Sequence, residues 1–219
     1  KDFIYGAIDG AVTTFAIVAG VAGAGLSSGV VIVLGVANLI ADGFSMAVSN
    51  YLGTRAEYQQ TRKARREEES HIDRYPEGER EEIRQIFAAK GFEGAELEKI
   101  VDTITADRKR WVETMIREEL GLSLNHPPAW KAGLATFVAF GLAGSIPLSP
   151  YLFDLAFNLP GFAFAWSSTM TAAAFFAVGA LKSIFVSEHW LASGAESLGI
   201  GGAAAGIAYA IGVALSGIA

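Results

Sequence analysis

Polar residues recur at every fourth position of an otherwise apolar stretch near the start of the chain. They are Asn38, Asp42, Met46 and Asn50. At about 100° per residue, this spacing places one slowly drifting polar stripe along a helix. A carboxylate and a thioether one turn apart suit a divalent transition metal of borderline softness, such as Fe²⁺. The alternative is a seam of hydrogen bonds between helices, for which the asparagines would suffice.

Another carboxylate stands at the start of a second apolar stretch. Asp9 is followed by a run without charge from Gly10 to Ser28. Ionisable side chains at membrane depth are costly and usually line a pathway for ions or protons. At the water boundary, however, an aspartate near the helix N-terminus would only interact favourably with the helix dipole. Its position alone leaves both interpretations open.

A third group of candidate ligands lies in the charged middle of the chain and mixes carboxylates with one histidine and one methionine. Its members are Glu68, His71, Glu79, Glu82, Glu113, Met115, Glu118 and Glu119. Runs of charge are most often solvated helix faces, but this mixture on helices that pack together favours metal binding. A ferritin-like di-iron site is excluded, because it needs two Glu-x-x-His motifs and only Glu68 to His71 has that spacing.

The elements that position these residues follow from the distribution of charge. Of 17 Lys and Arg, 15 lie between Arg55 and Lys131, and the rest of the chain is nearly free of charge and rich in Gly and Ala. About 20 apolar helical residues cross a bilayer. Five stretches qualify, at 8–27, 30–53, 129–149, 161–187 and 194–218. Segment 145–161, with three prolines, is expected to be a connector, as is segment 188–194.

These patterns predict an all-α membrane protein with five transmembrane helices and a polar insert between the second and the third. The expected domains are residues 1–53, the insert 54–128, and residues 129–219. The insert holds 14 Lys and Arg, so the positive-inside rule predicts that it and the N-terminus are cytoplasmic. The insert should contain three helices: an extension of the second membrane helix as far as Pro76, a helix at 77–92 and a helix at 95–121.

Composition also excludes several functions. The chain has no cysteine, which rules out disulfides and thiolate chemistry. The insert mixes both charges densely, so no nucleic-acid footprint is expected. No Ser–His pairing or His-Glu-x-x-His motif supports an enzyme.

Two segments resemble the vacuolar iron transporter family. They are DGAVTTFAIVAG (residues 9–20) and ADGFSMAVSNYLGTRAE (residues 41–57), followed by a Glu-rich insert that ends in ETMIREELGL (residues 113–122). The resemblance covers essentially the whole chain. It implies a homodimer of five-helix subunits that exports Fe²⁺, and sometimes Mn²⁺, from the cytosol in exchange for protons.

The resemblance also implies roles for single residues. Asp9 and Met46 match the ion path of the family. The metal-binding helices of the family match this chain at Glu68, Glu79, Glu82, Met115 and Glu119. Two positions depart from the plant pattern, because Asn38 and His71 stand where glutamates are usual. Asp42, one turn after Asn38, can supply the missing charge, and His71 remains able to bind metal.

We therefore expect proton-coupled export of Fe²⁺, with Mn²⁺, Co²⁺ and Zn²⁺ as further candidate ions and no permanent cofactor. The expected partners are divalent metal ions, protons, membrane lipids and a second copy of the chain. The alternative is a membrane-anchored iron sensor or buffer without transport. The compact length favours a prokaryotic plasma membrane, or a vacuolar membrane if the source is eukaryotic.

Overall fold

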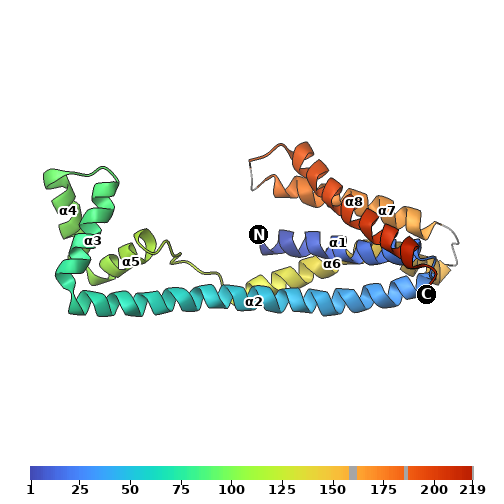
Figure 1. The fold of residues 1–219 in the computed structure, drawn as a ribbon, viewed down its shortest axis with the longest axis horizontal. Coiled ribbons are helices and arrows are strands. Elements are labelled where there is room, and N and C mark those ends of the chain that lie inside the picture. The colour runs from blue at the N-terminus through green and yellow to red at the C-terminus, as the bar shows by residue number, and fades with distance from the viewer. Residues whose placement is uncertain (158–161, 185–186, 219) are drawn as a thin grey trace. The chain divides into compact units, whose positions relative to one another are not determined.

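The chain folds into α-helices, as predicted. The computed structural model describes residues 1–157, 162–184 and 187–218, and within these ranges there are eight helices and no strand (Figure 1). The helices are α1 (Asp2–Gly23), α2 (Ser28–Arg74), α3 (Pro76–Ala89), α4 (Gly94–Thr105), α5 (Arg108–Glu118), α6 (Ala129–Phe157), α7 (Ala163–Lys182) and α8 (Trp190–Leu215). By length and composition, five of them can cross a membrane: α1, α2, α6, α7 and α8. The protein is therefore an integral membrane protein.

The chain divides into two compact units. One, the membrane unit, comprises Lys1–Tyr51 and Trp130–Ala219, and the other, the insert, comprises Leu52–Ala129. Helix α2 contributes residues to both units. In the membrane unit the two chain termini lie at opposite ends (Figure 1), as expected for an odd number of crossings.

Close helix approach organises the membrane unit. Its core includes Phe15, Val18 and Leu148, all nearly inaccessible. Gly10 of α1 faces the backbone of Phe140 in α6 so closely that a Cβ atom there would collide with the Phe140 carbonyl. Small residues of this kind let helices meet without an intervening side chain, which is how membrane helices gain packing energy.

Several predicted helix boundaries in the membrane unit were wrong: α1 ends at Gly23 rather than at residue 27, and α7 ends at Lys182 rather than at residue 187. Two helix starts also differ from the prediction. Helix α1 begins at Asp2 rather than at residue 8, because the Lys1 carbonyl already accepts from the Tyr5 amide (3.1 Å). Helix α8 begins at Trp190, inside the segment expected to be a connector. There the His189 ring caps the helix by accepting from the amide of Leu191 (3.3 Å).

The expected connector at 145–161 is a larger correction, because α6 continues as a helix through Pro147 and Pro150 to Phe157. A proline removes one helical N–H, and neighbouring hydroxyls can satisfy the freed carbonyls within a membrane protein. The Ser149 hydroxyl donates to the Ile146 carbonyl (2.8 Å), which Pro150 leaves without its helical donor. Ser167 of α7 donates to the Pro147 carbonyl (2.7 Å). The end of the expected connector, 158–161, lies outside the described residues.

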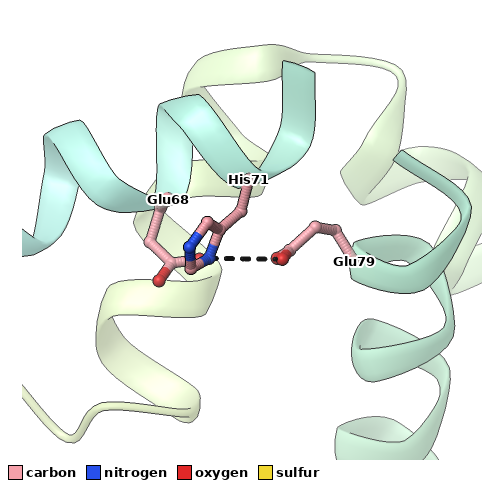
Figure 2. A group of neighbouring side chains, drawn as sticks. All are labelled: Glu68, His71 and Glu79. Atoms are coloured by element: carbon pink, nitrogen blue, oxygen red, sulfur yellow. Dashed lines mark ion pairs between the residues drawn. The ribbon is translucent and has the colours of Figure 1, made fainter. Parts of the chain in front are cut away.

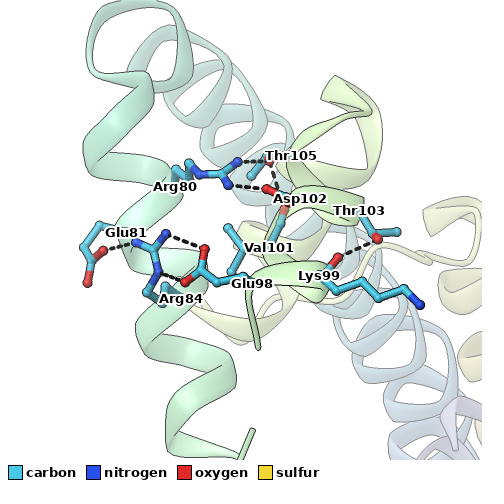
Figure 3. Close-up of polar contacts among 9 residues, drawn as sticks. All are labelled: Arg80, Glu81, Arg84, Glu98, Lys99, Val101, Asp102, Thr103 and Thr105. Atoms are coloured by element: carbon cyan, nitrogen blue, oxygen red, sulfur yellow. Dashed lines mark hydrogen bonds and ion pairs between the residues drawn. The ribbon is translucent and has the colours of Figure 1, made fainter. Parts of the chain in front are cut away.

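The insert is built on the extension of α2, which runs to Arg74 as predicted. Its apolar core contains Ile83 of α3, Val101 of α4 and Ile116 of α5, each completely buried. Ion pairs join α3 to α4 across their outer surface (Figure 3). Arg84 bonds Glu98 (2.7 Å), and Arg80 contacts Asp102 and the Thr105 hydroxyl.

The single helix predicted at 95–121 is divided into α4 and α5. The break falls at Asp107, whose backbone is extended and whose carboxylate accepts from the amide of Arg110 (2.8 Å). Aspartate is a strong N-cap because it satisfies a helical N–H that has no partner in the preceding turn. A new helix therefore starts at Arg108, and α5 can turn back onto the core of the insert.

Candidate functional site

Three candidate ligands of the insert converge on one point. Glu68 and His71 lie one turn apart on α2, and Glu79 reaches them from the first turns of α3 (Figure 2). One ligand atom from each of the three lies within 4.8 Å of the other two, and His71 Nδ1 is 3.6 Å from Glu79 Oε1. The short link at Tyr75, followed by Pro76 at the first position of α3, returns the chain so that Glu79 faces α2.

The two carboxylates of this cluster are buried without full compensation. Glu68 is 5% exposed and Glu79 is 6% exposed, whereas His71 is exposed. The Oε2 atoms of Glu68 and Glu79 have no hydrogen-bond partner within the described part of the chain. A buried charged oxygen without a partner is strongly disfavoured. The site therefore requires a proton or a cation.

The pKa values of the carboxylates in and around the cluster also favour a bound proton or cation. Burial, followed by the charges of Glu119 and Glu79, raises the pKa of Glu68 to about 7. The pKa of Glu79 is also raised, first by burial and then by Glu82, while His71 opposes the shift. Desolvation and the charge of Glu82 likewise raise the pKa of Glu119. Glu82 and Glu119 thus add negative potential to the cluster of Glu68, His71 and Glu79.

The other three candidates of the insert have different surroundings. Glu113 forms an ion pair with Arg65 (3.3 Å), and Glu118 pairs with Lys90. Met115 is completely buried in the apolar core. The structure therefore provides Glu113 and Glu118 with cations from the protein itself, unlike Glu68 and Glu79.

In the membrane unit, the polar stripe of α2 is tied to α1. The hydroxyl of Thr14, which is fully buried, donates to Asn38 Oδ1 (3.3 Å). The Asn38 amide group in turn donates to the carboxylate of Asp42. Asp42 also interacts electrostatically with the half-buried Asp9 of α1. Both carboxylates predicted for the pathway thus belong to one neighbourhood.

The C-terminal end of the stripe is hydrogen-bonded to α6. The Asn50 amide donates to the hydroxyl of Thr136 (2.7 Å). Met46 and Asn50 line a cavity of about 390 Å³ together with Asp2, Tyr5 and Thr136. Met46 is therefore accessible from a cavity whose lining includes polar residues.

Sequence analysis missed the two threonines that hold the stripe, Thr14 and Thr136. Their signal was present, since each is a hydroxyl residue in a mostly apolar helix, but their asparagine partners lie 24 and 86 residues away. It also missed the ion pair of Lys182 with Glu196 (2.8 Å), which joins α7 to α8.

Comparison with known proteins places these features in a family. Residues 1–213 match the VIT family. The chain is 34% identical to "Vacuolar iron transporter" of Toxoplasma gondii, over 97% of this chain and 72% of that protein. It is 32% identical to "Vacuolar iron transporter 1" of Arabidopsis thaliana, over 96% of this chain and 84% of that protein. It is 29% identical to "Vacuolar iron transporter 1" of Tulipa gesneriana, over 100% of this chain and 87% of that protein. The chain belongs to the VIT family.

Proposed function

We propose that this protein transports Fe²⁺ across a membrane and exports it from the cytosol in exchange for protons. The match of the chain over nearly its whole length to proteins named vacuolar iron transporters carries the proposal. Five helices able to cross a membrane support it, because two of them, α1 and α2, carry the candidate pathway residues Asp9 and Asp42. Mn²⁺, Co²⁺ and Zn²⁺ are candidate competing ions.

In this proposal the insert collects the ion. Glu68, His71 and Glu79 are its first ligands, and Glu82 and Glu119 add charge or further oxygen atoms. Carboxylate and imidazole ligands suit Fe²⁺ and its neighbours in the first transition row. Because the pKa of Glu68 is about 7, an arriving cation displaces a proton there, and affinity falls as the pH falls.

The membrane unit then carries the ion. Asp9, Asp42 and Met46 are the proposed contacts, with Asn38 and Asn50 completing the stripe. A carboxylate in a poorly solvated site can exchange a cation for a proton, so the same groups provide the coupling. We further propose that the insert and the N-terminus face the cytosol and that two copies form the transporter.

Flux into proteoliposomes tests the proposal. The protein inserts into vesicles in both orientations, and both orientations contribute to the measured flux. Fe²⁺ uptake is therefore measured with a proton gradient of either sign and without a gradient, under anaerobic conditions. We expect uptake by the wild type to follow the proton gradient and to be lost in Asp9→Asn, which keeps shape but not charge. Glu188→Gln, in the connector before α8, is the matched control and should transport normally.

The alternative function is an iron sensor or buffer that binds metal through the insert without transport. The cluster of Glu68, His71 and Glu79 would serve that role equally well. The same vesicles separate the two functions: a sensor binds Fe²⁺ but gives no uptake at any gradient, which would refute transport.

A further inference from the structure

A cavity at the opposite end of α6 from its junction with the insert has the chemistry of a cation site. It has a volume of about 370 Å³ and lies between the last turns of α6 and the first turns of α7. Its walls include three aromatic rings, those of Phe153, Phe162 and Trp166, and the thioether of Met170. Asp154 is the one ionisable residue among them.

The carboxylate of Asp154 lacks a compensating charge. It is half-buried, and it forms no ion pair within the described residues, while residues 158–161, 185, 186 and 219 carry no basic side chain. Asp154 also stands in the last turn of α6, which has no basic residue. Helix C-termini carry partial negative charge, so a carboxylate there is unfavourable unless a cation is close.

The walls of the cavity select the kind of cation. Small hydrated ions such as Mg²⁺ or Ca²⁺ need several oxygen ligands, and this cavity has one carboxylate. Faces of aromatic rings attract substituted ammonium ions, which lose little hydration on entering an apolar site. The three rings are largely exposed, from 58% for Phe153 to 65% for Phe162, so a ligand can reach them from outside the protein.

The position of the cavity indicates where such a cation comes from. Helix α6 is long and apolar enough to cross a membrane, and its end should lie near the depth of the lipid headgroups, where tryptophan is also enriched. We propose that Asp154, Phe153, Phe162 and Trp166 form a binding site for the ammonium end of a zwitterionic phospholipid headgroup. We call these four residues the headgroup site. The proposal is independent of ion transport.

Fluorine NMR of the full chain with 5-fluorotryptophan can test the headgroup site. The chain has four tryptophans, and the resonance of Trp166 is assigned by its loss in Trp166→Phe. The protein is placed in nanodiscs of phosphatidylglycerol to which phosphatidylcholine is added stepwise. We expect a saturable shift of the Trp166 resonance, while the resonance of Trp190, outside the site, moves little.

A second titration tests whether the site recognises the ammonium cation without the rest of the lipid. Tetramethylammonium chloride, added to phosphatidylglycerol nanodiscs and compared with equal NaCl, should shift Trp166 alone. In Asp154→Asn, reaching half of the maximal Trp166 shift should need at least about ten-fold more of either ligand. Glu188→Gln should titrate as the wild type does. Unchanged resonances of the other tryptophans check that Asp154→Asn is folded.

Three outcomes would overturn the inference. Equal titrations of the wild type and Asp154→Asn would mean that the rings are only an interfacial aromatic belt. A response to phosphatidylcholine but not to tetramethylammonium would mean that the site does not recognise the cation. No response of Trp166 to either ligand would mean that the cavity is closed in the membrane, for instance by a second copy of the chain.

Discussion

Replacing Glu68 with Gln should stabilise the metal-free insert at neutral and alkaline pH. Glu68 is 5% exposed, and its pKa is about 7 against an ordinary value of 4.5. The difference between the two pKa values corresponds to about 3 kcal/mol. The glutamine keeps the shape of the side chain but cannot ionise, so it avoids this cost.

The sign of the pH dependence follows from proton binding. Between the two pKa values the folded insert holds a proton on Glu68 that the unfolded chain has released. Stability of the wild type therefore falls as the pH rises from about 4.5 to about 7 and stays low above that. The contribution is absent in Glu68→Gln, so the variant gains up to about 3 kcal/mol over the wild type at pH 8.

Hydrogen exchange measures this pH dependence of the stability of the insert within the full chain. Backbone amides of the insert core, such as those of Ile83, Val101 and Val112, are followed by mass spectrometry in nanodiscs with a metal chelator. After correction for intrinsic exchange, wild-type protection should fall roughly 100-fold between pH 5 and pH 8, because about 1.4 kcal/mol is a factor of ten. Protection in Glu68→Gln should fall less, because only Glu79 and Glu119, whose pKa values are also raised, still contribute.

A neighbouring glutamate provides the control. Glu67 is exposed and forms an ion pair with Lys63 (3.6 Å), so Glu67→Gln should keep the pH dependence of the wild type. If Glu68→Gln also retained that dependence, Glu68 would not be the group whose ionisation is opposed, and the electrostatic argument for a cation at the cluster would fail.

Three further predictions concern other residues. Glu113→Gln should change Mn²⁺ affinity, measured by calorimetry of the full chain, by less than about three-fold, because Arg65 already pairs with Glu113; a much larger loss would make Glu113 a ligand. Thr14→Val should slow Fe²⁺ uptake, because the Asn38 that bonds Asp42 loses its anchor, and Thr14→Ser should restore it; equal uptake by both variants would show that the hydroxyl is dispensable. Gly10→Ala should destabilise the membrane unit by about 1–3 kcal/mol through collision with Phe140, seen as a lower midpoint of thermal unfolding, and an unchanged midpoint would contradict the close approach of α1 and α6.

The sequence alone determined the features that depend on local pattern. Segregation of charge from apolar residues predicted five membrane helices, and the absence of a breaker before Pro76 predicted the extension of α2. Spacing by four residues predicted the stripe that contains Asp42 and Met46. These inferences succeed because hydropathy and helical periodicity act over neighbouring residues, whatever the rest of the chain does.

Only the tertiary structure decided how distant residues combine. Helix α6 passes through two prolines, and its Pro147 carbonyl accepts a hydrogen bond from Ser167 of another helix, a donor that no pattern near Pro147 contains. The carboxylates of the insert look alike in sequence, yet Glu113 meets an arginine while Glu68 and Glu79 meet each other and His71. A carboxylate takes its charge state and its ligand from what surrounds it after folding, and for these residues the surroundings come from other helices.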